Sequence, residues 1–234
     1  MTFAQRARRE DGFTLVELLA AMSIGVVIVL AALMVLDTSV KTTTRTQQRV
    51  DAVQRGRAAM DDITRQLRSQ VCLGKVASMV EARTDSVTFY GDLTDGTTGT
   101  PPQRRTLTYA GGKLTQNVEA GTGMPPATQW LTAPNTTTLL SDVGTDPALT
   151  AAADGTRPVF RYYAFSQDPV PQLVGPLATP VSAAVLPTIV KISVAFGVRR
   201  SGAPATDAPM TVMQDDVYIR SADPNLPSPS PLCA

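Results

Sequence analysis

The chain has 234 residues, with 21 Lys and Arg against 20 Asp and Glu and a net charge of +1 at pH 7. This balance argues against a strongly basic nucleic-acid-binding protein. No histidine is present, which excludes His-dependent catalytic triads and removes the commonest metal ligand. Two cysteines without a CxxC pair also exclude a Cys-rich zinc site. We therefore expect no catalytic site, no metal and no cofactor.

An apolar run extends from Phe13 to Leu36, and Glu17 is its only charged residue. About 24 helical residues span roughly 36 Å, which is enough for a hydrocarbon core of ~30 Å. The run therefore predicts a membrane-spanning helix. An acidic side chain in such a helix costs about 2.5 kcal/mol or more, so it is usually paired or functional.

The run contains no cation that could pair with Glu17. Cleavage after Gly12 would create an amine at Phe13, one helical turn from Glu17, in the same subunit or in a neighbour. Basic residues on the cytoplasmic side set the orientation of a membrane helix. We therefore expect residues 1–12 in the cytoplasm and the chain after Leu36 outside, because three arginines precede the run: Arg6, Arg8 and Arg9.

Two simpler interpretations of this run stay open. An ordinary secretory signal also has a basic start, but its apolar centre has only about 7 to 15 residues and carries no acid. A plain signal anchor would hold Glu17 near the positive end of the helix dipole or at the membrane interface, without a partner. The two interpretations differ in whether the leader is removed.

The residues from Gly12 onward resemble a known signal. A short basic leader that ends in Gly, then Phe-Thr-Leu-Val-Glu-Leu-Leu and an apolar helix, is similar to the class III signal of type IV pilins and type II secretion pseudopilins. The resemblance implies cleavage between Gly12 and Phe13 by a prepilin peptidase, followed by methylation of the Phe13 amine. It also implies that Glu17 meets the Phe13 amine of an adjacent subunit during assembly.

Helical periodicity continues beyond Leu36 without an interrupting proline, to about Val71. Apolar residues recur at steps of three, four or seven, which predicts a helix face that docks on a head domain: Val50, Val53, Met60, Ile63, Leu67 and Val71. Gly56 is the weak point of this helix, at a cost of about 1 kcal/mol relative to Ala. The charged residues lie at other positions, where we expect solvent: Arg45, Arg49, Arg57, Asp61, Asp62, Arg65 and Arg68.

The region after the helix reads as antiparallel β-structure. Gly111-Gly112 separates two strand patterns as in a hairpin, and a second hairpin with a long loop is expected near the C-terminus. The predicted strands are Ser86 to Tyr90, Arg104 to Ala110, Lys113 to Val118, Pro158 to Phe165, Val190 to Val198 and Met210 to Arg220. Residues 91–103, 119–157 and 166–187 are rich in Gly, Thr, Pro and Asp and are expected to be surface loops.

The sequence thus predicts an α+β protein with a long N-terminal helix packed on an antiparallel β-sheet head. The expected segments are a leader (1–12), a transmembrane half-helix (13–36), an amphipathic half-helix (37–73), a β-rich head (74–220) and a Pro/Ser-rich extended tail (221–234). Cys72 and Cys233 are candidates for a disulfide bond, because an exported domain lies where disulfides persist. Two unpaired thiols are the alternative.

Several pairs or groups of residues are weak candidates for chemistry. Adjacent acids, Asp61-Asp62 and Asp215-Asp216, point in different directions on a helix or a strand, so solvated charge is the expected role. Asp92, Asp95 and Gly96 lack the Glu spacing of a calcium loop.

Three aromatic residues are candidates for stacking on a ligand or on bases: Trp130, Tyr162 and Tyr163. Core and rim packing is the commoner use of such residues. The stalk arginines are expected to face water, lipid headgroups or neighbouring subunits rather than DNA.

The order of helix and strands resembles the larger minor pilins and pseudopilins of the PilW or PulJ type. This implies a structural subunit of a filament or its tip, with other subunits, a prepilin peptidase, membrane lipid and an inner-membrane assembly platform as partners. No GxxxxGK[ST] phosphate loop is present, so a separate ATPase is expected as motor. A tip adhesin or DNA-uptake subunit, and a signal-anchored exported domain outside any filament, are the alternatives.

Overall fold

The computed structural model describes residues 13–73, 76–91, 103–122, 129–130, 135–151, 155–166, 170, 172–202 and 210–219. The chain divides into two compact units, Met1–Gln47 and Gln48–Ala234. A single helix, α1 (Leu15–Arg68), begins in the first unit and ends in the second. The leader (1–12), residues 92–102 and the tail (221–234) lie outside the described residues.

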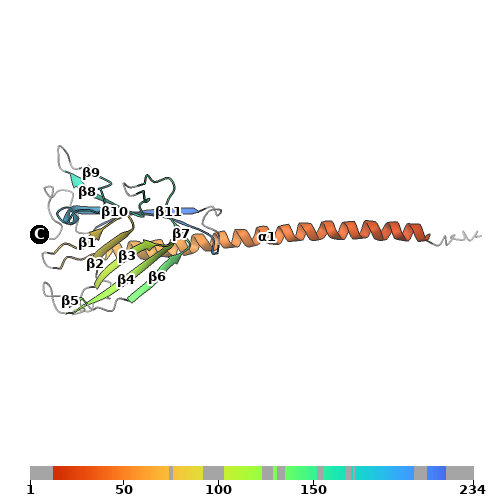
Figure 1. The fold of residues 1–234 in the computed structure, drawn as a ribbon, viewed down its shortest axis with the longest axis horizontal. Coiled ribbons are helices and arrows are strands. Elements are labelled where there is room, and N and C mark those ends of the chain that lie inside the picture. Colours follow the sequence, from red (N-terminus) through yellow and green to blue (C-terminus); the bar gives the residue numbers. More distant parts are fainter. Residues whose placement is uncertain are drawn as a thin grey trace, which may run out of the picture. The chain divides into compact units, whose positions relative to one another are not determined.

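The second unit contains two antiparallel sheets (Figure 1). The first has the order β1-β2-β3-β4-β5, and β6 also pairs with β4. Its strands are β1 (Met79–Ala82), β2 (Ser86–Gly91), β3 (Gln103–Ala110), β4 (Lys113–Thr122), β5 (Gln129–Trp130) and β6 (Asn135–Ser141).

The second sheet has the order β11-β10-β8-β9, and β7 also pairs with β10. Its strands are β7 (Val143–Gly144), β8 (Phe160–Ser166), β9 (Gln172–Val174), β10 (Ile189–Val198) and β11 (Thr211–Tyr218), with a short 3-10 helix, η1 (Leu186–Thr188), before β10. A long helix followed by antiparallel sheets is the α+β class that the sequence predicts.

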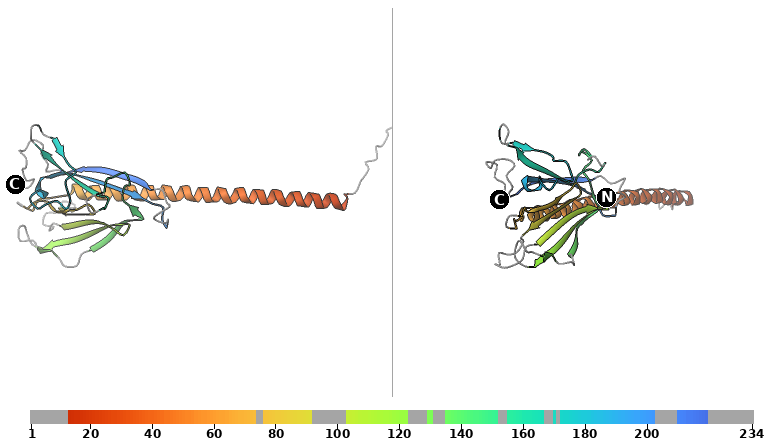
Figure 2. Two further views of the ribbon diagram at one scale, coloured as in Figure 1. Left: turned by 45° about the horizontal axis from the view of Figure 1, so that its top comes forward. Right: turned by 60° about the vertical axis from the view of Figure 1, so that its left-hand side comes forward.

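The two sheets lie on either side of the C-terminal part of α1 (Figure 2). One hydrophobic core joins all three layers: it contains Ile63 and Leu67 from α1, Phe89 from the first sheet, and Phe160 and Phe196 from the second. Each of these five side chains is essentially inaccessible to solvent. The helix therefore serves as the central layer of this unit.

Tyr162 connects the two sheets directly. Its side chain is fully buried, and its single O–H donates a bifurcated hydrogen bond to the carbonyl oxygens of Arg83 (2.9 Å), in the turn after β1, and Ser86 (3.1 Å), at the start of β2. Burial raises the pKa of Tyr162 well above its ordinary value. The phenol is thus a satisfied core group rather than a surface for ligand stacking.

The predicted docking face of the helix is confirmed in its C-terminal half. Met60, Ile63 and Leu67 are buried, whereas Val50 is 48% exposed. The small residues Ala52, Gly56 and Ala59 complete the buried face. The prediction of this face did not include them, because it was based on large apolar side chains. The helix ends at Arg68, before the boundary expected at residue 73, because the chain turns into the bridge between Gln70 and Gly91.

Gly56 has a packing role that its helix propensity does not predict. A Cβ atom at this position would lie 2.7 Å from Val198 Cγ2 and 2.7 Å from the Met213 sulfur. Real Cβ atoms are essentially never found so close to another heavy atom. Gly56 therefore allows α1 to approach β10 and β11 more closely than any other residue would.

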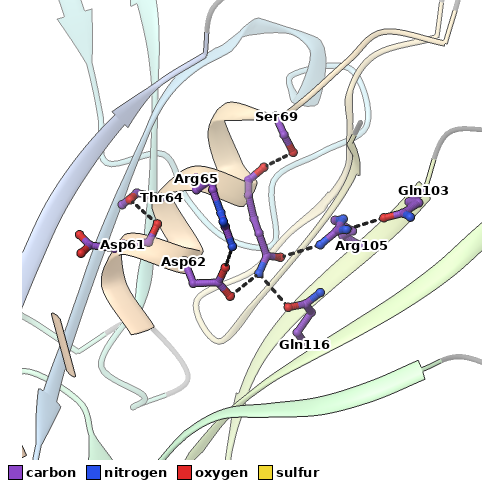
Figure 3. Close-up of polar contacts among 9 residues, drawn as sticks. Asp61, Asp62, Thr64, Arg65, Ser69, Gln103, Arg105 and Gln116 are labelled. Carbon is purple, nitrogen blue, oxygen red and sulfur yellow. Dashed lines mark hydrogen bonds and ion pairs between the residues drawn. The ribbon is translucent and has the colours of Figure 1, made fainter. Parts of the chain in front are cut away.

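A buried polar network joins α1 to the inner face of the first sheet (Figure 3). Gln66 is 1% exposed, and its Nε2 donates to Asp62 Oδ2 (2.9 Å) and Gln116 Oε1 (2.7 Å). Arg105 Nη1 donates to Gln66 Oε1 (3.4 Å), and Arg105 also bonds Gln103. Burial lowers the pKa of Arg105, against the opposing effect of Asp62. Gln66 thus satisfies three polar groups at once.

All the predicted strands are present, with small shifts of their ends. The pairing of Ala110 with Lys113 closes the β3–β4 hairpin. Gly111 and Gly112 form its turn, with φ values of 55° and 73°. The second predicted hairpin is confirmed by the antiparallel pairing of β10 with β11. Glycine is the residue that adopts such positive φ values without strain.

The expectation that 119–157 and 166–187 are loops was partly wrong. β4 continues to Thr122, β6 pairs with β4, β7 pairs with β10, and β9 pairs with β8. The sequence of β6, NTTTLLS, shows no alternation of apolar residues. β6 forms a strand because β4 beside it supplies the backbone hydrogen-bond partners.

Gly56→Ala tests the close approach of α1 to the second sheet. Alanine gains about 1 kcal/mol of helix propensity, but overpacking costs about 1–3 kcal/mol, so we expect a lower melting temperature of the head by circular dichroism. Gly25→Ala is the control, since a Cβ there meets no atom within 4 Å. A Gly56→Ala protein that melts at or above the wild-type temperature would contradict the packing argument.

Gln66→Ala tests the buried polar network. The substitution leaves Gln116 Oε1 and Arg105 Nη1 without this partner, and an unsatisfied buried group costs about 1–3 kcal/mol. We expect the urea midpoint of the head to fall accordingly. Gln54→Ala, at an exposed position of the same helix, should leave the midpoint unchanged, and equal midpoints for the two variants would refute the role of Gln66.

Candidate assembly site

The N-terminus of α1 is closed by a side-chain cap. The helix begins at Leu15, and the carbonyl oxygen of Thr14 accepts the first helical hydrogen bond from Leu18 N (3.1 Å). Thr14 Oγ1 accepts a hydrogen bond from Glu17 N (3.2 Å). The first amides of a helix have no partner inside it, and a Thr at this position satisfies one of them.

Thr14 is a residue that the sequence reasoning missed. Thr14-Leu15-Val16-Glu17 has the S/T-x-x-E pattern of a capping box, which marks a helix start. This pattern is local and can be recognised in the sequence, in addition to the pairing that the charge of Glu17 indicates. Thr14 therefore adds a local function to this segment, since it sets the residue at which the helix begins.

Glu17 lies in the first turn of α1 and is exposed. An acid at this place interacts favourably with the positive end of the helix dipole. Among the described residues, no side chain forms a hydrogen bond or an ion pair with the Glu17 carboxylate. The carboxylate is therefore available to a partner from outside this part of the chain.

Of the two residues at the predicted cleavage site, the structure describes one. Phe13 is 84% exposed and precedes the helix. Gly12 lies outside the described residues, as do Arg6, Arg8 and Arg9. Cleavage and methylation thus stay predictions from the sequence.

The N-terminal part of α1 presents apolar side chains in all directions. Every residue from Phe13 to Leu36 is exposed, and Glu17 is the only charged one among them. The most apolar window of the helix has a mean hydropathy of 2.8 and is 0% buried, so α1 is long and apolar enough to cross a membrane. A soluble helix normally has one polar face, so this part of α1 requires lipid or other apolar helices around it.

The other candidates have structural partners of their own. Trp130 stacks on Tyr90 with ring centroids 5.1 Å apart, and the Lys191 ammonium lies 4.1 Å from the Tyr163 ring centroid. Asp62 bonds Gln66 and pairs with Arg65, whereas Asp61 is exposed. Asp216 pairs with Lys191, and Asp215 accepts the Asp216 amide. The adjacent acids thus contact different groups, as expected. The expectation of solvated charge is wrong for Asp62 and Asp216, which pair with Arg65 and Lys191.

Cys72 is disulfide-bonded. Its predicted partner, Cys233, lies outside the described residues, as do Asp92, Asp95 and Gly96. In the described part of the chain, no group of three or more His, Cys, Asp or Glu side chains is arranged to hold a metal ion.

Comparison with known families identifies the same N-terminal segment. Residues 7–33 match the family described as the prokaryotic N-terminal methylation motif. The chain therefore carries the signature of type IV pilins and pseudopilins, as the sequence resemblance implies. No curated protein matches the chain.

Thr14→Ala tests the cap. Loss of an N-cap side chain costs about 1 kcal/mol of helix stability, so we expect faster hydrogen exchange at the amides of Leu15 to Leu18 in the nanodisc-embedded protein. Thr14→Ser, which retains the hydroxyl group, is the matched control and should exchange like the wild type. Unchanged exchange in Thr14→Ala would rule out the cap.

Proposed function

We propose that this protein is a minor pilin or pseudopilin, a structural subunit that is processed by a prepilin peptidase and assembled into a filament or its tip. The observation that carries the proposal is the exposed, apolar N-terminal part of α1 with one unpaired acid, Glu17, in its first turn. The methylation motif over residues 7–33 supports processing and assembly with other pilin subunits.

The physical mechanism follows from what surrounds this helix. In the membrane, lipid covers the apolar side chains between Phe13 and Leu36. When the subunit leaves the bilayer, equivalent helices of neighbouring subunits replace the lipid. Glu17 then pairs with the Phe13 amine of a neighbour, because a single charge in an apolar helix bundle is costly and an opposite charge offsets that cost.

The proposal includes an orientation and further partners. The leader lies in the cytoplasm and the head outside, first on the membrane and then on an extracytoplasmic filament. An assembly platform in the inner membrane and a separate ATPase supply the work of extraction. The role is structural rather than enzymatic, which the lack of histidine in the sequence supports.

The proposal also includes a disulfide bond between Cys72 and Cys233. A link between residues so far apart in the sequence restricts the unfolded chain and stabilises the head. Peptide mapping without reduction measures the pairing directly. A spectrum in which Cys72 is linked to another molecule would remove this part of the proposal.

Glu17→Gln tests the assembly role of the carboxylate. The variant keeps the size of the side chain but loses the charge, and removing one partner of a buried ion pair costs about 3–5 kcal/mol. We expect at least about tenfold less subunit in sheared filaments, with cleavage intact. Asp37→Asn is the matched control, because Asp37 is an acid of the same helix that pairs with Lys41 (2.7 Å).

Mass spectrometry of the N-terminus in these strains separates assembly from processing. Gly12→Arg should leave the uncleaved precursor, whereas Glu17→Gln and Asp37→Asn should begin at Phe13. Normal incorporation of Glu17→Gln would refute the pairing role. A wild-type protein with an intact Met1 would instead identify a signal-anchored domain outside any filament.

A further inference from the structure

The outer face of the first sheet carries a regular set of polar side chains, on the side away from α1 (Figure 2). Val87, Leu107 and Leu114 belong to the core on the inner face, so the residues that alternate with them along their strands lie on the outer face. Residues paired across neighbouring strands lie on the same face. The registers thus form two rows across β2, β3, β4 and β6, which we call the hydroxyl array: Ser86, Thr108, Thr115 and Thr138, and Thr88, Thr106, Asn117 and Thr136.

Much of the hydroxyl array is open to a partner. Thr136 and Thr138 are exposed, and the other members are half-buried between their cross-strand neighbours, except Thr88, which is 8% exposed. Two hydroxyl groups of the array bond each other, those of Thr88 and Thr106 (3.1 Å). Among the described residues, four hydroxyl groups of the array form no hydrogen bond: those of Ser86, Thr108, Thr136 and Thr138. Each of them can donate one hydrogen bond and accept two.

An aromatic pair borders the hydroxyl array on the same face. Tyr90 alternates with the buried Phe89 on β2, and Trp130 of β5 lies opposite Gly121 of β4. Their rings stack with centroids 5.1 Å apart and planes 10° apart, and the Arg104 guanidinium lies 5.3 Å from the Trp130 ring centroid. Trp130 is the only tryptophan in the sequence, and it lies half-buried at the surface instead of in the core. Trp, Tyr and Arg are the residues most enriched where proteins bind partners.

The charges beside the hydroxyl array largely neutralise one another. Arg104 of β3 lies opposite Glu119 of β4, and the two side chains form an ion pair. At the β1 end of the array, Glu81 pairs with Arg83. Lys113 is exposed at the margin of the face, beside the β3–β4 turn. The array itself consists of hydroxyl groups and one amide, so the centre of this face is polar and uncharged.

These features restrict the chemistry of the partner. A nucleic acid or an acidic polymer requires a row of cations along its backbone, which the hydroxyl array lacks. A protein partner requires a largely apolar centre of the interface, which it also lacks. A neutral sugar chain matches both parts of the face, because its hydroxyl groups can bond the array and the C–H groups of a pyranose ring can pack on an aromatic ring. Strands repeat at roughly 4.8 Å, so an extended chain can contact several rows and strands at once.

We propose that the outer face of the first sheet binds a neutral polysaccharide. A pyranose ring packs against the Tyr90–Trp130 pair, and neighbouring sugars bond the hydroxyl array. The site uses no residue of α1 and does not depend on filament assembly. It gives the head a recognition function in addition to the structural role.

The fluorescence of Trp130 tests this proposal directly, because no other tryptophan contributes to the emission. The full-length protein is titrated in lauryldimethylamine oxide micelles, which contain neither sugar nor indole. The neutral probes are cellohexaose, maltohexaose and chitohexaose, and the charged probes are hexagalacturonate and oligothymidylate. We expect a saturable change of emission with at least one neutral hexasaccharide. Both charged probes should bind at least about tenfold more weakly than that sugar, because their charges would lose water without gaining a partner cation.

Tyr90→Ala tests the aromatic part of the site and retains Trp130 as the reporter. Loss of the ring should weaken binding of the sugar at least about tenfold, whereas Tyr90→Phe should bind nearly as the wild type. Tyr218→Ala is the control, at an exposed tyrosine of the second sheet, and should leave the affinity unchanged.

Threonine substitutions on β6 test the hydroxyl array without changing side-chain size. The double substitution Thr136→Val and Thr138→Val should weaken binding at least about fivefold, as the loss of two hydrogen bonds implies. Thr137→Val is the matched control, because this exposed residue lies between the two and alternates to the other face of the sheet. All three positions are exposed, so the melting temperatures by circular dichroism should agree.

Four outcomes would overturn the proposal. They are no saturable change with any neutral hexasaccharide up to about 5 mM, binding of a charged probe as tight as that of the sugars, unchanged affinity in Tyr90→Ala, and equal affinities of the Thr136→Val/Thr138→Val and Thr137→Val proteins.

Discussion

Both sheets of the head bury their apolar faces against the same short length of helix. Ile63 and Leu67 of α1 belong to one core with residues of both sheets, and Gly56 brings the helix backbone close to Val198 and Met213. Because a sheet is stable only when its apolar face is covered by another element, neither sheet is independent of α1. This explains why Gln48–Ala234 forms one compact unit that includes the end of the helix.

The N-terminal part of the same helix has the opposite requirement. Its backbone groups are satisfied internally, and Thr14 caps its first turn, so it is locally complete. Its side chains lack packing partners, since they are apolar on all sides of the helix and exposed. Lipid and neighbouring helices are two environments that would cover them, and exchange of one for the other is the physical basis of the filament assembly that we propose. In this proposal, Glu17 adds a charge that makes the exchange depend on a correctly placed partner.

The sequence predicted those helices and strands in which apolar residues recur at regular spacing. The helix and the β10–β11 hairpin belong to this group. β6 was missed because its polar side chains carry no alternation, and only pairing with β4 makes it a strand. Every residue of β10 is buried, including the polar Lys191 and Ser193, whose partners Asp216 and Arg161 lie on the two neighbouring strands. Neither effect is encoded within the segment concerned.

The sequence by itself determined the long apolar helix, the methylation motif over residues 7–33 and the acid at Glu17, because these depend only on residues close together in the chain. The tertiary structure alone decided the close packing at Gly56 and the buried polar network around Gln66. Such features arise where segments distant in sequence meet, and their side chains acquire a role only from the groups that surround them after folding.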